Sequence, residues 1–273
     1  MNTEQSQNQR SGRKLTVVSS LHYFRLVYRA VLFLFALVIY IVFRVRTSAQ
    51  VESFIAQRPV ILTMIWVVFM VEMIMRFIPS RFESPGSQKQ FRRNYVRTGK
   101  TQIDIQDNHG TMLVAIIWIT FNGIFGALYM ANILDEGIMI LLSCLFSVCD
   151  MICILFFCPF QTWFLKNKCC STCRIYNWDY AMMFTPLFFV KSFYSWTLLA
   201  MSLLLLLRWE ITFYRAPERF SEATNEYLHC KNCTEKLCAH KKQLRSVWKD
   251  ISETKLARLR FLQKPEDGER KED

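Results

Sequence analysis

The sequence predicts an all-α, polytopic integral membrane protein with four clear transmembrane helices, a fifth span or re-entrant hairpin, and a cysteine-containing amphipathic C-terminal tail. Of the 273 residues, 52% are hydrophobic, whereas glycine and proline contribute only 8 and 7 residues. The apolar residues stand in blocks rather than at the spacing of amphipathic core helices. Several blocks reach the roughly 20 residues that cross a hydrocarbon core of about 30 Å. The length of these blocks therefore predicts membrane-spanning helices.

The chain opens with a polar segment, residues 1–20, that we expect to stay on the mature protein. The apolar run that follows continues to Phe43 without the small-residue cleavage site of a signal peptide. It predicts a first span from Tyr23 to Phe43, and a second span follows from Pro59 to Ile78. The transmembrane domain as a whole is expected over residues 21–209.

A basic loop over residues 79–110 orients the chain. It carries six lysine and arginine residues against three acidic ones, and cytoplasmic loops are enriched in positive charge. We therefore expect this loop in the cytoplasm, together with the N-terminus, which lies two spans earlier. The membrane that this implies is a bacterial-type inner (plasma) membrane.

A third span is predicted from Met112 to Ile133 and a fourth from Gly137 to Cys158. The stretch "LDEG" that joins them is short and acidic, as expected of an outer turn. The chain then returns to the cytoplasm at a second loop, residues 159–179.

The apolar stretch from Tyr180 to Leu207 allows two interpretations. Aromatic groups at "YNWDY", "KSFYSW" and "RWEITFY" follow one another at about 13 residues, as at membrane interfaces. At the α-helical rise each arm would cover roughly 20 Å, which favours a re-entrant hairpin that turns at Lys191 to Trp196. The alternative is one tilted helix with Lys191 facing other helices, which would place the following tail outside.

The basic C-terminal tail, residues 210–273, favours the hairpin, because positive charge belongs on the cytoplasmic side. Its segment 241–264 gathers apolar residues near one helical face and lysine and arginine over the rest. Such a helix is suited to an anionic membrane surface. It could equally pack as a soluble helix on its own tail.

Two groups of closely spaced thiols are the strongest chemical signal. The first, "CCSTC", lies in the second cytoplasmic loop, and the second, "CKNCTEKLCAH", lies in the tail. Two cysteines separated by two residues can direct both thiolates onto one tetrahedral metal, and a later Cys or His can complete the shell. Iron–sulfur clusters and redox dithiols use similar spacings, and inert thiols are the plain alternative. The candidate metal ligands are Cys169, Cys170, Cys173, Cys230, Cys233, Cys238 and His240.

Charged residues inside the apolar blocks form a second set of candidates, because a charge within a bilayer is costly. Asp150 stands between Cys149 and Cys153 in the fourth span and is a candidate for proton or ion handling. Glu72 and Arg76 are spaced as a helical i,i+4 pair that would neutralise itself. The intramembrane polar candidates are Asp150, Lys191, Glu72 and Arg76.

These observations predict an integral membrane protein that binds zinc or an iron–sulfur cluster through cytoplasmic cysteines, with a possible link to redox chemistry. A thiol–disulfide or quinone-linked oxidoreductase and a scaffold with a metal-stabilised tail are the alternatives. The chain lacks G-x4-G-K-[ST], G-x-G-x2-G, H-E-x2-H and G-x-S-x-G, so no motif assigns a reaction. The formal charge of +12 indicates membrane orientation and contact with anionic lipid, and we expect no nucleic-acid partner.

Overall fold

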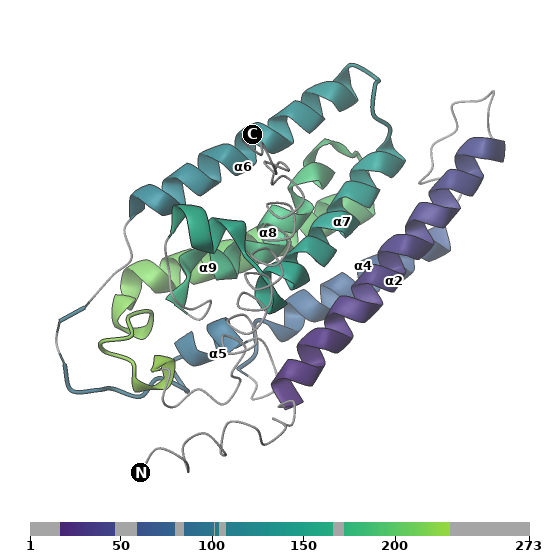
Figure 1. The fold of residues 1–273 in the computed structure, drawn as a ribbon. Helices are drawn as coiled ribbons and strands as arrows, with labels where there is room; N and C mark the ends of the chain where they lie inside the picture. The colour runs from purple at the N-terminus through teal and green to yellow at the C-terminus, as the bar shows by residue number, and fades with distance from the viewer. Residues whose placement is uncertain are drawn as a thin grey trace, which may run out of the picture. The chain divides into compact units, whose positions relative to one another are not determined.

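The computed structural model describes residues 17–46, 59–79, 85–100, 102–103, 108–165 and 172–229. The chain divides into two compact units, residues 1–236 and 237–273, and all described residues belong to the first. The described part is helical (Figure 1). Its longer helices are α2 (Val17–Arg46), α4 (Pro59–Met75), α6 (Asn108–Met130), α7 (Glu136–Leu155) and α9 (Phe193–Arg215). Its shorter elements are α5 (Pro85–Gln90), η1 (Phe160–Phe164), η3 (Arg174–Trp178), α8 (Asp179–Phe184), η4 (Thr185–Phe189), η5 (Pro217–Arg219) and η6 (Glu226–Leu228).

Four helices in the described part are long and apolar enough to cross a membrane: α2, α6, α7 and α9. This set differs from the four clear spans that the sequence predicts, because α4 is shorter than expected and α9 takes its place. The α-helical part of the predicted second span has 17 residues. Beyond Met75 the chain tightens into i→i+3 bonds, such as that from the Phe77 N–H to the Ile74 carbonyl. Pro79 follows, and a residue before proline is disfavoured in a helix.

One end of the helical unit is built around the connection between α6 and α7, and we call it the turn end. Asp135 caps α7 by accepting a hydrogen bond from the Ile138 N–H at 2.9 Å. The same carboxylate accepts the Tyr40 hydroxyl at 2.7 Å. Because Tyr40 lies near the end of α2, the C-terminal end of α2 and the start of α7 meet here.

The segment after Cys173 reverses direction and forms a hairpin. Its first arm consists of η3, α8 and η4, and its second arm is α9. Residues 190–192 between them are not helical. Trp178 donates to Glu210 at 2.7 Å, and Arg174 binds the same carboxylate, so the start of the first arm lies beside the end of α9. The first arm has ten 3₁₀ residues and six α-helical residues. At rises of about 2.0 and 1.5 Å it extends for about 29 Å along the chain, against about 24 Å if the same residues were all α-helical.

Arg174 fastens this hairpin at its open end. Its guanidinium binds Glu210 and lies 4.4 Å from the ring centre of Phe213. Burial alone would lower the pKa of Arg174, but hydrogen bonds from Arg174 to Glu210 and Tyr214 outweigh burial and raise the pKa above its ordinary value. The group is therefore a permanent positive charge at this junction.

The opposite end of the unit, which we call the loop end, joins the basic loop to the start of the C-terminal tail. The Thr98 N–H donates to the Thr224 carbonyl at 3.1 Å, and the Glu226 N–H donates to the Val96 carbonyl at 2.8 Å. The fully buried Asn225 side chain donates to the Lys89 and Arg219 carbonyls at 3.0 and 2.9 Å. Figure 1 shows α5 beside this yellow-green segment and the end of α9. Both segments therefore lie at the same end.

The core sits between α4, α7, α8 and α9. Phe69 of α4 and Phe184 of α8 pack edge to face, with ring centres 5.2 Å apart. In contrast, α2 and α6 leave broad apolar faces exposed, including Phe24 and Val31 on α2 and Ile116 and Ile119 on α6. Exposed apolar surface of this extent is a liability in water but is expected against lipid.

Candidate functional site

A buried ion network joins three helices near the loop end. Arg29 of α2 is only 1% exposed. Its Nη2 lies 2.7 Å from Glu72 Oε2 on α4, and its Nη1 lies 3.2 Å from Asp150 Oδ2 on α7. Nη1 also donates to the Ser147 carbonyl at 3.1 Å. One arginine from the first helix therefore holds acids that follow it by 43 and 121 residues.

A second buried pair lies next to this network. Arg76 Nη2, just beyond α4, lies 2.5 Å from Asp179 Oδ2 at the start of α8. The Arg76 guanidinium also lies 4.8 Å from the ring centre of Tyr180, a distance at which a cation is attracted to an aromatic face. The Tyr180 hydroxyl donates to Glu72 at 3.1 Å and so connects the two parts.

The predicted helical pair of Glu72 with Arg76 is wrong in its partners. Glu72 binds Arg29, with Arg25 at 3.7 Å and the Tyr28 hydroxyl as further neighbours. Arg76 instead binds Asp179. Partners on other helices are favoured because a buried charge must be compensated by a close opposite charge, and these partners surround it within the bundle.

The network is electrically balanced. Three arginines, Arg25, Arg29 and Arg76, face three acids, Glu72, Asp150 and Asp179. A buried charge without a partner is costly, whereas a balanced and hydrogen-bonded set is tolerated. The network therefore stabilises the contact of α2, α4, α7 and α8 inside an apolar bundle.

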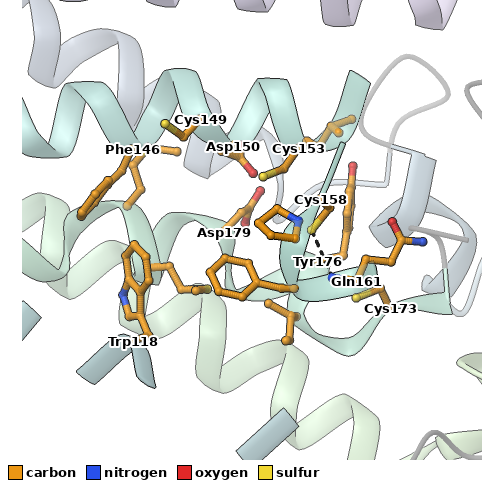
Figure 2. Close-up of a pocket in the computed structure, with 16 residues that line it drawn as sticks. Trp118, Phe146, Cys149, Asp150, Cys153, Cys158, Gln161, Cys173, Tyr176 and Asp179 are labelled. Atoms are coloured by element: carbon orange, nitrogen blue, oxygen red, sulfur yellow. Dashed lines mark hydrogen bonds between the residues drawn. The ribbon is translucent and has the colours of Figure 1, made fainter. Parts of the chain in front are cut away.

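A cavity of about 290 Å³ adjoins the network. Figure 2 shows the Asp150 and Asp179 carboxylates turned toward one another on its wall, with Trp118 and Phe146 at one end of the cavity and Cys173 and Gln161 at the other. Each carboxylate is held by a different arginine, Arg29 or Arg76. The cavity thus places two acids on the wall of an otherwise largely apolar space.

Sulfur is concentrated around this cavity. The chain holds 10 cysteines and 12 methionines among 273 residues, yet six of the sixteen lining residues are of these two types. Cys153 and Cys158 both line the cavity, and the Gln161 N–H donates to Cys158 Sγ at 3.4 Å (Figure 2). The six are Cys149, Cys153, Cys158, Cys173, Met182 and Met183.

Of the residues predicted as metal ligands, only Cys173 lies in the described part. It is buried and lines the cavity. Cys169, Cys170, Cys230, Cys233, Cys238 and His240 lie outside the described residues. Within the described ranges, no group of three or more His, Cys, Asp or Glu side chains is arranged to hold a metal ion. The described residues therefore offer no site of the kind that zinc or an iron–sulfur cluster uses.

The predicted polar residues divide between site and periphery. Asp150 lies on the cavity wall, and Glu72 and Arg76 belong to the adjoining network. Lys191 is exposed at the break of the hairpin.

Sequence reasoning missed Arg29 and Asp179 as members of the site. Arg29 could have been found as a cation within the apolar run of the first predicted span. Asp179 gave no such signal, because it stands in an aromatic interface segment and can be explained as a residue that favours a helix start. No protein-family model, curated protein or solved structure matches this chain.

Proposed function

We propose that the chain is an integral membrane protein that binds a small cation in the cavity between α7, α8 and η1. The observation that carries the proposal is the pair of carboxylates, Asp150 and Asp179, facing one another on the cavity wall (Figure 2). Carboxylate oxygens that converge on one space are acceptors for a positively charged or proton-donating guest.

The membrane setting is supported by the length and composition of α2, α6, α7 and α9. The basic loop and the start of the tail meet at the loop end through the Thr98 and Glu226 hydrogen bonds. Because positive charge favours the cytoplasmic side, we place the loop end in the cytoplasm. The cavity then lies toward the cytoplasmic half of the bundle.

The arginines explain how such a site persists without a guest. Two facing carboxylates inside lipid would repel one another and be poorly solvated. Arg29 and Arg76 balance them, so the empty bundle carries no uncompensated charge. A cation that enters the cavity shares the carboxylate oxygens of Asp150 and Asp179 with the arginines. The net charge of these groups is then positive for as long as the cation stays bound. The charge balance of the site is therefore restored when the cation leaves.

Thermal stability of the detergent-solubilised protein tests this proposal. Each of Na⁺, K⁺, Mg²⁺, Mn²⁺, Zn²⁺ and Ag⁺ is added to wild type and to the variant Asp150→Asn/Asp179→Asn. We expect at least one ion to raise the melting temperature of wild type and to leave the variant unchanged, because ligands that bind only the folded state stabilise it. Asp135→Asn, at the turn end, is the matched control and should respond as wild type does.

The same shift in the Asp150→Asn/Asp179→Asn variant as in wild type would show that the carboxylates do not bind the ion. An absence of any shift in wild type across the six ions would contradict the proposal itself.

The cysteine spacing in the tail supports a second, separate proposal. Cys230, Cys233, Cys238 and His240 have the spacing of a zinc or iron–sulfur site. Metal analysis of anaerobically purified protein, before and after Cys230→Ser/Cys233→Ser, tests it. Zinc or iron that is lost with the two thiols supports the site, and an equal metal content in both proteins contradicts it.

A further inference from the structure

The sulfur side chains indicate which kind of cation the cavity prefers. Two carboxylates alone favour hard ions such as Mg²⁺ or Na⁺, whereas thiolate and thioether ligands select soft ions such as Cu(I). Sulfur lines the cavity at six of sixteen positions. The remaining walls are mainly aromatic and aliphatic, so they offer a hard ion few further oxygen ligands. The composition of the wall thus favours a soft guest.

The fold brings two of the thiols, Cys153 and Cys158, to the wall of one cavity. Helix α7 ends at Leu155, and the Phe157 N–H still bonds the Ile152 carbonyl at 3.2 Å. This wide closing turn carries Cys158 back toward Cys153, which stands in the last turn of α7. The pair comes from the helix terminus itself, which holds it beside the cavity.

We propose that the cavity binds one soft monovalent ion of the Cu(I) class between the Sγ atoms of Cys153 and Cys158. This inference rests on the proposed cation site and names its substrate class. Two thiolates are sufficient ligands for Cu(I), whereas tetrahedral zinc requires four ligands. Among the described residues, no group of three or more His, Cys, Asp or Glu side chains is arranged to hold a metal. A site with two thiol ligands is compatible with that finding.

The step balances in protons and charge. The ion replaces both thiol protons, so M⁺ and two S–H groups give an anionic bis-thiolate complex and two protons. Both protons leave to solvent, one of them by way of Asp150 on the same cavity wall. The complex forms next to a network in which Arg29 and Arg76 are paired with acids. No change in oxidation state is involved.

Neighbouring sulfurs provide alternative ligands within the same cavity. Cys149 stands one helical turn before Cys153 and is exposed. Met182 and Met183 of α8 line the cavity as well. An ion held by two soft ligands exchanges readily when further soft ligands are near, so this arrangement favours passage of the ion along the wall over permanent storage.

Peptide-level alkylation tests the proposal in a full-length protein in which the five thiols outside the described residues are serine. The five are Cys169, Cys170, Cys230, Cys233 and Cys238. N-ethylmaleimide reacts with the remaining thiols with and without Ag(I), a soft ion that does not change oxidation state here. At free Ag(I) ten times the dissociation constant, reaction of Cys153 and Cys158 should slow about tenfold, because only the ion-free fraction reacts.

Binding of Cu(I), supplied anaerobically against the chelator bicinchoninate, provides the second readout. The five-serine protein should retain one Cu(I) per chain, and Cys153→Ser/Cys158→Ser should lose it. Cys144→Ser is the matched control, because Cys144 is a buried thiol of the same helix that does not line this cavity. It should bind as its parent does.

Unprotected Cys153 and Cys158 at saturating Ag(I) would overturn the inference, and this measurement leaves both proposed ligand thiols in place. A stabilising effect of Na⁺ or Mg²⁺ that depends on Asp150 and Asp179 would then still support the cation site itself. Conversely, Cu(I) binding that persists in Asp150→Asn/Asp179→Asn would support the thiol pair and contradict the role of the carboxylates.

Discussion

Arg29 is the residue on which the buried network depends most. Its guanidinium contacts Glu72, Asp150 and the Ser147 carbonyl, and the side chain is 1% exposed. Each acid would lose its nearest cation if Arg29 were removed. An acid left without a partner in apolar surroundings must either remain charged at high cost or take up a proton.

We expect Arg29→Met to lower the free energy of unfolding in detergent by about 3–5 kcal/mol, the cost of breaking a buried ion pair on one side. Circular dichroism during chemical unfolding measures it. Arg44→Met is the control, because the Arg44 side chain is 63% exposed beside Asp135 and should cost at most about 1 kcal/mol. Adding Glu72→Gln and Asp150→Asn to Arg29→Met should recover part of the loss. Equal stability of wild type and Arg29→Met would show that the network contributes nothing.

These partners were beyond sequence reasoning for a physical reason. Local spacing identifies only pairs on one helix face, and it pointed to Glu72 with Arg76. The observed partners of Arg29 follow it by 43 and 121 positions, so only the packing of α2 against α4 and α7 brings them together. Asp150 could be predicted as a site candidate because the cost of a charge in an apolar block does not depend on knowing its partner.

Among the elements, the first arm of the hairpin departs most from a regular helix. Only six of its residues, Asp179–Phe184, are α-helical, and 3₁₀ segments flank them. The apolar blocks predicted α2, α6 and α7, because hydrophobic length alone sets a span, whereas α4 is shorter than predicted and α9 was one arm of the region left open. The reversal near Lys191 was predicted from aromatic spacing, but the arm length was not. The arm begins earlier than predicted, at Arg174, and its 3₁₀ residues have a larger rise than the α-helical rise assumed from the sequence.

The contact between this arm and α6 can be tested with two glycines. A Cβ on Gly126 would lie 2.1 Å from the Phe189 ring of η4, whereas a Cβ on Gly123 would have nothing within 4 Å. We expect Gly126→Ala to destabilise the protein by about 1–3 kcal/mol through overpacking. Gly123→Ala should be neutral or stabilise it by about 0.5–1 kcal/mol, because alanine is the better helix former.

Thermal unfolding of both glycine variants in the same detergent checks this prediction. Equal stabilities for the two variants would mean that η4 does not pack on α6 as described. The pair is informative because both substitutions add the same methyl group to the same helix, so intrinsic helix propensity cancels in the comparison.

At the scale of the whole molecule, the contacts of the described elements define two ends, the turn end and the loop end. The turn end holds Tyr40 and Asp135, and the start of α9 lies toward it, because Tyr194 of α9 and Ile140 of α7 line one small cavity. The loop end holds the basic loop, Arg174 and the segment 217–229. The cavity and its thiols lie nearer the loop end, because Cys173 lines the cavity and directly precedes Arg174 of η3. The side of the membrane that each end faces therefore decides to which compartment the cavity lies closer.

The distribution of native thiols allows this arrangement to be measured simply. All ten cysteines lie between residues 144 and 173 or between 230 and 238. The thiol nearest the turn end, Cys144, is buried. A cysteine at the exposed Lys191 position therefore adds a new reactive thiol at the hairpin break.

The measurement that tests the account most directly is labelling of wild type and Lys191→Cys with a membrane-impermeant maleimide, on intact cells and on inverted vesicles. Opposite placement of the two ends predicts that intact cells label Lys191→Cys but not wild type, and that inverted vesicles label the native thiols of wild type. Labelling of wild type in intact cells, or of the new thiol only after inversion, would contradict a bundle whose cavity lies toward the cytoplasm.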